Sequence, residues 1–335
     1  MNTRRRTAVL LEVLGIYLAG QLVVDLLVRG FGASLVNPLG TFTVGISNAE
    51  LITASGQFLT LILFQYAGWF LLVIPINWWD RRHGPGAYGL TTAGNSWHTL
   101  ILAGVAAAAL GALPVLCVQL IDAVHHLGET AAWRQALFAT SWRRWEFWLF
   151  TAVMSWALIP VLEELFFRGY CQRRLAEEWG DGAAITGTAC MFTLAHSQYL
   201  ILNAYNVGMV VSLLTLAIAF GIVFAWTRSL VPSIVAHAII NVPMTSYWQA
   251  ICLVVFVTVA LIVGRRAAAA VRHVWHGATM RRCALLSVVG TAYVTAARHL
   301  DGAAFIAAGL VAAALALQAL DRQRRRAARP VLPSA

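Results

Sequence analysis

Lysine is absent from this chain of 335 residues, and charge of either sign is scarce. All 24 Lys and Arg residues are arginines, and charged residues make up 11% of the sequence. Hydrophobic residues make up 60%, and the mean hydropathy is +0.72. A soluble domain carries about 25% charged residues. The composition therefore excludes an ordinary soluble protein and indicates a membrane protein.

Several catalytic and binding signatures are also missing. The chain has no Gly-rich phosphate loop, no Gly-x-Ser-x-Gly and no His-Glu-x-x-His, which excludes several common hydrolase classes. Its five cysteines are scattered, without a Cys-x-x-Cys pair. They predict buried free thiols rather than a disulfide framework or a zinc knuckle.

Apolar runs of about 20 residues recur along the chain, each long enough to cross a hydrocarbon core of about 30 Å. The predicted spans are Thr7 to Val28, Leu51 to Trp78, Leu100 to Ile121, Phe147 to Phe167, Ala184 to Asn203, Val207 to Thr227, Leu230 to Trp248, Ala250 to Gly264, Cys283 to Ala297 and Gly302 to Leu320. The last run is Ala-rich and would also suit a peripheral helix. We predict an all-α, polytopic membrane helix bundle of about eight to ten transmembrane helices.

The chain has no separate soluble domain in this interpretation. We divide it into N-terminal transmembrane helices (1–145), a core (146–248) and C-terminal transmembrane helices with a basic tail (249–335). The polar residues that suggest chemistry lie in the core.

Arginine clusters alternate between loops, as the positive-inside rule expects. The predicted cytoplasmic clusters are Arg4, Arg5 and Arg6; Arg81 and Arg82; Arg168, Arg173 and Arg174; Arg228; Arg265, Arg266, Arg272, Arg281 and Arg282; and Arg322, Arg324, Arg325 and Arg326. Both termini are then cytoplasmic, although Arg134, Arg143 and Arg144 fall on the predicted outer side. The arginines that give the net charge of +10 lie at the ends of these spans. This position indicates contact with anionic lipid and no nucleic-acid partner. The Arg-only, Ala-rich composition suggests a bacterial plasma membrane.

Glu163 and Glu164 stand side by side in a stretch otherwise apolar enough to lie in a bilayer. Carboxylates at membrane depth cost a few kcal/mol each to insert, so such a pair indicates a functional site. On a helix Glu164 shares a face with Arg168, while Glu163 points about 100° away. We expect Arg168 to hold Glu164 ionised and to leave Glu163 available as a general base. Pro160, one turn earlier, would loosen the helix.

Glu12 and Asp25 interrupt the first span, and the sequence assigns them no function. We expect them to pair with an arginine elsewhere in the bundle or to lie near an interface.

Two later spans carry polar residues at helical spacing: Phe192 with His196, and His237 with Asn241. In the predicted topology Glu163, His196 and His237 each lie about ten residues, or about 15 Å, from the cytoplasmic end of their span. A lone histidine in a membrane helix is more often a packed residue than a catalyst. Three spans with polar side chains at one depth nevertheless predict a single buried site.

These residues form three motifs: Glu-Glu-x-x-x-Arg, Phe-x-x-x-His and His-x-x-x-Asn. In this order they resemble the motifs of the CPBP family of intramembrane proteases, which includes the CAAX prenyl endopeptidases and the bacterial Abi proteins. The resemblance spans about Phe147 to Tyr247. It implies an endopeptidase that cleaves a membrane-associated protein or peptide.

The resemblance also implies roles for the site residues. Glu163, helped by His196, would activate the attacking water, while Glu164 and Arg168 would organise the site. His237 and Asn241 would stabilise the tetrahedral oxyanion. This mechanism requires no cofactor.

Other interpretations remain open at this stage. Glu163, His196 and His237 could also bind zinc and leave a position for water, although adjacent glutamates point apart on a helix. Buried Glu, His and Asn also occur in proton-coupled transporters, but the chain has no detectable inverted repeat. A non-catalytic binding or immunity protein of the same family is the third alternative. The sequence does not identify the substrate.

Overall fold

The computed structural model describes residues 3–31, 48–79, 84–125, 127, 144–196, 199–276 and 280–297, and parts of 310–322. Every regular element in these ranges is a helix, and the all-α helix bundle expected from the sequence is confirmed. The elements are α1 (Thr3–Phe31), α2 (Asn48–Trp79), η3 (Pro85–Tyr88), α3 (Trp97–His125), α5 (Trp145–Thr151), η4 (Ala152–Leu158), α6 (Ile159–Glu164), η5 (Leu165–Gln172), α7 (Arg173–Trp179), α8 (Asp181–Ala195), α9 (Ala204–Thr227), α10 (Val231–Ile240), α11 (Ser246–Trp275) and α12 (Met280–Ala297).

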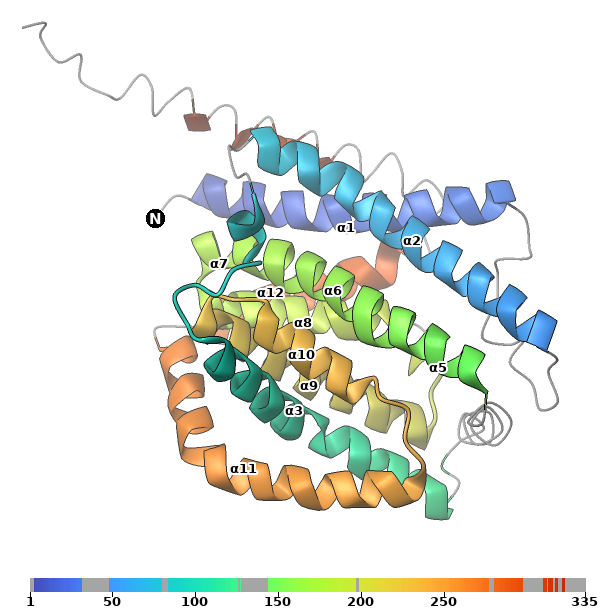
Figure 1. The fold of residues 1–335 in the computed structure, drawn as a ribbon. Coiled ribbons are helices and arrows are strands. Elements are labelled where there is room, and N and C mark those ends of the chain that lie inside the picture. Colours follow the sequence, from blue (N-terminus) through green and yellow to red (C-terminus); the bar gives the residue numbers. More distant parts are fainter. Residues whose placement is uncertain are drawn as a thin grey trace, which may run out of the picture.

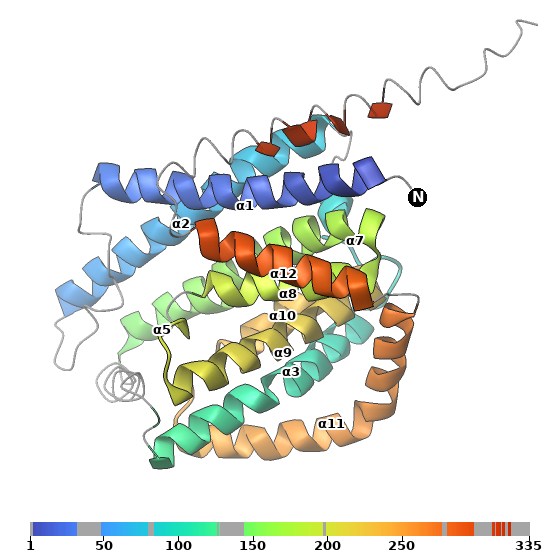
Figure 2. The same ribbon diagram turned by 180° about the vertical axis from the view of Figure 1, so that it is seen from behind.

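The helices pack around a central rod formed by the successive segments α5 to α7 (Figure 1). Helices α1 and α2 pack on each other along one side of this rod, while α3, α9 and α10 form a group on the other side. Helix α8 contacts α9 and is covered by α12, as the reverse view shows (Figure 2). The site residues on the central rod are therefore enclosed by neighbouring helices.

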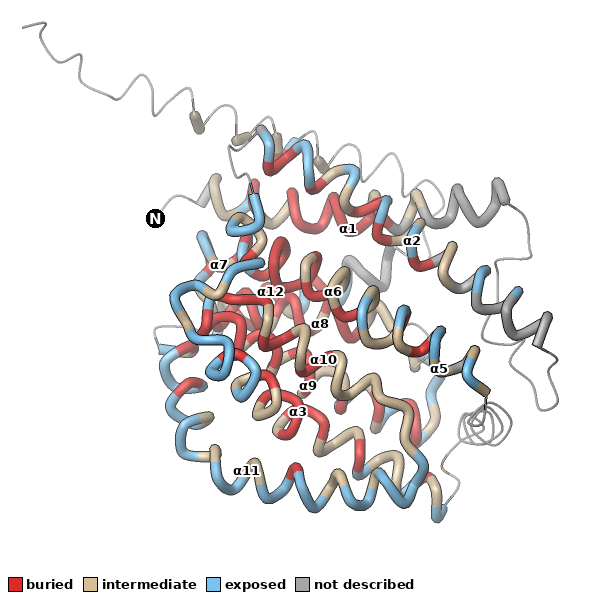
Figure 3. The backbone as a smooth tube through the Cα atoms, viewed as in Figure 1, coloured by how far each residue is buried: buried red, intermediate tan, exposed pale blue. Residues whose placement is uncertain are grey.

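Three of the described helices, α3, α9 and α11, are long and apolar enough to cross a membrane. Helix α11 lies at the edge of the bundle and is mostly exposed (Figure 3). Its exposed side chains include Val254, Leu261 and Ile262. An exposed apolar face of this length is unfavourable in water and suits a lipid environment. This agrees with an integral membrane protein.

Two predicted spans end earlier than expected, and the reason is local. Helix α8 ends at Ala195 rather than near Asn203, because the backbone leaves helical geometry at His196. Asn203 instead caps the next helix by accepting a hydrogen bond from the Asn206 backbone N–H at 2.8 Å. Helix α10 ends at Ile240, shortly before Pro243, which cannot continue a helix. The last predicted span, Gly302 to Leu320, lies mostly outside the described residues.

The central rod is not a regular α-helix, since η4 and η5 are π-helical. The cause near η4 is Pro160, which has no N–H to donate. In a π-helix the backbone N–H of residue 160 would donate to the carbonyl five residues earlier, which is that of Ser155. The Asn241 side chain donates to this carbonyl instead, at 3.0 Å. A side chain of α10 thus satisfies the backbone group that the proline leaves open.

The two unexplained acids of the first span have different outcomes. Glu12 is buried and forms an ion pair with Arg174 at 2.7 Å, and it also accepts a hydrogen bond from Tyr170. Its expected pairing with an arginine is therefore present. The side chain of Asp25 lies outside the described residues. The cysteines are free as expected, but only Cys171 and Cys283 are buried, while Cys190 and Cys252 are partly exposed and Cys117 is exposed.

The predicted topology can be tested at the two ends of α8. We expect a reporter fused after Gly180 to be cytoplasmic and one fused after Leu202 to be external, because the arginine clusters assign α7 to the inner side. Paired alkaline phosphatase and fluorescent-protein fusions at both sites would measure this. A cytoplasmic signal at Leu202 would contradict the topology and the shared depth of the polar residues.

Candidate active site

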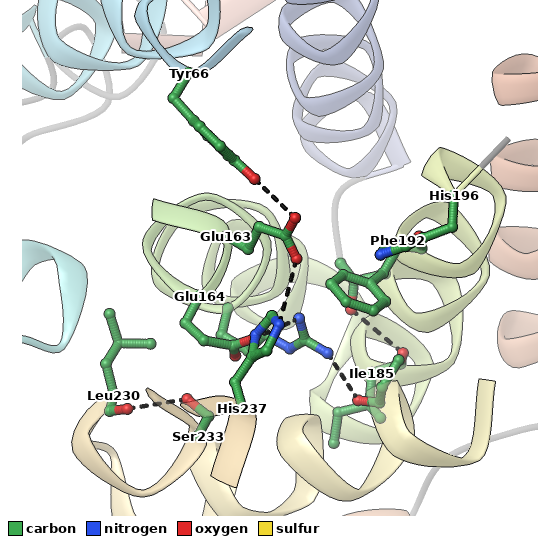
Figure 4. Close-up of polar contacts among 12 residues, drawn as sticks. Tyr66, Glu163, Glu164, Ile185, Phe192, His196, Leu230, Ser233 and His237 are labelled. Carbon is green, nitrogen blue, oxygen red and sulfur yellow. Dashed lines mark hydrogen bonds and ion pairs between the residues drawn. The ribbon is translucent and has the colours of Figure 1, made fainter. Parts of the chain in front are cut away.

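Glu163 and Glu164 end α6 and have different environments. Glu164 is completely buried, whereas the Glu163 side chain is 14% exposed. The difference follows from helix geometry, because neighbouring residues point in directions about 100° apart. Glu164 faces α9 and α10, and Glu163 faces the α2 side of the site (Figure 4).

Glu164 is held by two cationic or polar side chains. Its Oε1 accepts from Arg168 Nη1 at 3.0 Å and lies 3.0 Å from His237 Nδ1. The guanidinium of Arg168 also donates to the Ala217 carbonyl at 3.2 Å. The expected i, i+4 pair therefore exists, with neither partner exposed by more than 2%. A buried charge of this kind is stable only when it is paired and hydrogen-bonded.

Aromatic rings enclose the Arg168 guanidinium. The Phe192 ring lies 4.6 Å from it and the Phe220 ring lies 5.3 Å from it. Cation–π contacts of this kind are worth about 2 kcal/mol when desolvated. The phenylalanine of the Phe-x-x-x-His motif thus has a structural role in packing on the arginine of the first motif.

Glu163 has one engaged oxygen and one without a hydrogen bond. Its Oε1 accepts from the Tyr66 hydroxyl at 2.8 Å. Its Oε2 has no hydrogen-bond partner among the described residues and lies 3.7 Å from His237 Nε2. That separation is too long for a hydrogen bond. The carboxylate is therefore oriented through Oε1, while Oε2 is buried without a hydrogen bond among the described residues.

His237 stands between the two glutamates, with one ring nitrogen near each (Figure 4). Glu164 is ion-paired with Arg168 and can only accept, so Nδ1 of His237 carries a proton and donates. This assignment follows from the hydrogen-bond network. The Nε2 atom then faces Glu163.

His196 contacts the ring of Phe192, which in turn lies near His237. Its Nδ1 is 2.8 Å from the Phe192 carbonyl, which can only accept, so Nδ1 carries the proton and Nε2 of the neutral ring is an acceptor. The Phe192 ring lies 4.7 Å from the His196 ring and 6.1 Å from the His237 ring. The structure thus brings both histidines against Phe192, but it gives no direct contact between His196 and Glu163.

Asn241 is the sixth predicted site residue and lies at the end of α10, one turn after His237. One N–H of its amide is engaged by the Ser155 carbonyl at 3.0 Å. The amide group carries a second N–H, whose direction is fixed by the first bond. Asn241 is therefore held against the central rod rather than against a glutamate.

The described residues do not bring the predicted metal-binding set together. No group of three His, Cys, Asp or Glu side chains in the described ranges has the spacing of a metal site. Of the predicted set Glu163, His196 and His237, the structure shows no contact of His196 with the other two residues, although its Nε2 is left available by the bond of Nδ1 to the Phe192 carbonyl. We therefore derive no step through a metal.

Tyr66 is a site residue that the sequence analysis missed. It lies in an apolar run of α2, far from the motifs along the chain. A single tyrosine in such a run gives no signal of its own, because its contact with Glu163 depends on how α2 packs.

The buried ion pair can be tested by stability. We expect Arg168→Ala to lower stability by about 3 to 5 kcal/mol, because it leaves the Glu164 charge buried without its cation. Glu164→Gln with Arg168→Met should recover part of that loss. Thermal aggregation in one detergent measures both. Glu163→Gln is the control, with little expected change, and a double variant no more stable than Arg168→Ala would contradict the pairing.

The comparisons with known proteins agree with the motifs. Residues 143–243 match the family model described as Rce1-like, type II CAAX prenyl endopeptidase. No curated protein and no solved structure matches the chain. At the family level the match indicates a protease associated with membranes. The resemblance predicted from the three motifs is confirmed, since residues 143–243 match the model of the Rce1-like CAAX prenyl endopeptidases.

Proposed function

We propose that this chain is an intramembrane endopeptidase in which Glu163 activates a water molecule. The observation that carries the proposal is the difference between the two glutamates. Glu164 is fully buried and ion-paired with Arg168, while the Glu163 side chain is 14% exposed. Each has an Oε2 without a hydrogen bond among the described residues, but a general base must be within reach of water, and of the two glutamates Glu163 is the exposed one.

In the proposed reaction Glu163 Oε2 takes a proton from water while the water oxygen attacks the carbonyl carbon of the scissile peptide. The proton then passes to the nitrogen of the leaving amine as the C–N bond breaks. His196 assists through its Nε2, which is an acceptor in the neutral ring. In the structure His196 contacts Phe192 and has no direct contact with Glu163. Its assistance to Glu163 therefore requires a small side-chain movement or an intervening water.

The oxyanion of the tetrahedral intermediate requires donors that are fixed before the reaction. Asn241 has a second amide N–H whose direction is set by the bond to Ser155. His237 can donate from Nε2 when it carries both protons, and carboxylates face both of its nitrogens. We assign these two residues to the oxyanion, and the reaction needs no metal.

The proposed substrate is a membrane-associated protein or peptide. Such a substrate reaches the buried site laterally or from the cytoplasmic surface, and the exposed apolar face of α11 indicates that the enzyme lies in a lipid bilayer. We propose a bacterial plasma membrane with both termini inside, on the evidence of the arginine clusters.

Glu163→Gln tests the general base. We expect it to abolish cleavage without unfolding the protein, because the amide keeps the volume of the side chain and removes the base. The full chain in nanodiscs would be assayed with an S-farnesylated, internally quenched CAAX peptide. In parallel, new N-termini would be compared in membranes that contain the wild type or the variant.

Glu177→Gln is the matched control, since it makes the same change at an exposed residue away from the glutamate pair, where Glu177 forms an ion pair with Arg174 at 2.9 Å. His196→Ala should also lose activity, and the loss in the Glu163→Gln, His196→Ala double variant should be far from additive. Cleavage by Glu163→Gln above a few per cent of the wild-type rate would show that another group is the base.

Asn241→Ala tests the oxyanion assignment. Removal of one such donor lowers kcat about a hundred- to a thousandfold, and we expect a loss in this range. The lost bond to Ser155 should lower stability by only about 1 kcal/mol. The initial rates and thermal aggregation would be measured on the same preparation. A large loss of stability with an unchanged kcat would assign Asn241 to the helix alone.

A further inference from the structure

A tyrosine outside the family segment contacts the proposed general base. The Tyr66 hydroxyl donates to Glu163 Oε1 at 2.8 Å, and Tyr66 lies on α2, whereas the family match begins at residue 143. The direction of the bond is fixed, because an ionised carboxylate can only accept. Figure 4 shows the phenol extending from α2 to the carboxylate.

Aromatic packing fixes the position of this phenol. Tyr66 is 2% exposed and packs edge-on against Trp69, with ring centroids 5.4 Å apart. Trp69 in turn lies parallel to Phe166 at 4.1 Å, and Phe166 is about one turn after Glu163 on the central rod. This packing therefore fixes the position and direction of the Tyr66 hydroxyl relative to the Glu163 carboxylate.

The contact distinguishes the two oxygens of Glu163. Oε1 is engaged by Tyr66, while Oε2 has no hydrogen-bond partner among the described residues and faces His237 Nε2 at 3.7 Å. The terminal torsion of a glutamate is broad and has little preference of its own. Without a donor on Oε1, the carboxylate could rotate away from the site.

We propose that Tyr66 is a positioning residue for hydrolysis: it binds Oε1 of Glu163 and so presents Oε2 to the attacking water. The inference rests on the proposed function, since it assigns the working oxygen of the same base. A phenol suits the role because it supplies one neutral donor from an apolar cluster and adds no charge that would pair with Glu163.

The first test is Tyr66→Phe, which removes the hydroxyl and keeps the ring. A hydrogen bond to a charged group corresponds to a kcat loss of about ten- to a hundredfold, with KM changed less than about twofold. Tyr17→Phe is the matched control, because Tyr17 is equally buried and packs on the same Trp69 at 5.7 Å. The probe is the same S-farnesylated quenched peptide, cleaved by the full chain in nanodiscs.

The second test requires no substrate. Infrared spectra of the full chain with ¹³C-carboxyl glutamate contain one band that is absent from Glu163→Gln. We expect this band to shift in Tyr66→Phe and to stay in place in Tyr17→Phe, because of these two tyrosines it is Tyr66 that donates to that carboxylate. Thermal aggregation of each variant shows whether it is folded.

The outcomes separate the two proposals. A shifted band with a lower kcat supports the positioning role, and an unchanged band overturns it whatever the activity. A shifted band with a wild-type kcat also overturns it, because the bond would then not matter for the reaction. If the wild type and Glu163→Gln release the same products, the proposed function fails, and the band still decides whether Tyr66 holds Glu163.

Discussion

The buried pair of Glu164 and Arg168 is the constraint on which the site depends. Both side chains are shielded from solvent, and each has a further partner: His237 for the carboxylate and the Ala217 carbonyl for the guanidinium. A buried ion pair repays its desolvation only with such additional hydrogen bonds. The pair therefore fixes the positions of α9 and α10 against the central rod. Glu163, on the neighbouring helical face, lies outside this ion pair, which is why we propose it as the general base.

The distorted backbone of the central rod has a related cause. Pro160 removes one donor, and Asn241 replaces it at the Ser155 carbonyl. The same contact holds α10 against the rod near the glutamates, so His237 and Asn241 are placed by one helix that is fixed at two points. Local π-helical segments are frequent at functional sites because they allow such insertions. In a regular α-helix, a backbone N–H of the same helix would donate to the Ser155 carbonyl.

The sequence predicted the parts of this structure that depend on local spacing. The i, i+4 relation of Glu164 and Arg168, the helical class and most helix positions follow from periodicity and hydropathy. The end of α8 was placed too late, because apolar content continues past Ala195 while the cap at Asn203 acts on the next helix. The contact of His196 with the Phe192 carbonyl was not predicted, since it depends on the backbone at the helix end. Contacts between distant helices, such as Tyr66 with Glu163, have no local signal.

The family segment is completed by helices that lie outside it. Helix α2 supplies Tyr66 to Glu163, and α1 supplies Glu12 to Arg174, so two charged residues of the segment find partners near the N-terminus. Without Glu12, Arg174 would lose its strongest partner in a buried position, which is costly. The segment 143–243 can therefore carry the motifs, but its geometry depends on α1 and α2. Substitutions in these two helices should affect the site although they change none of its motif residues, because the hydrogen-bonded groups are shared between the two parts of the chain.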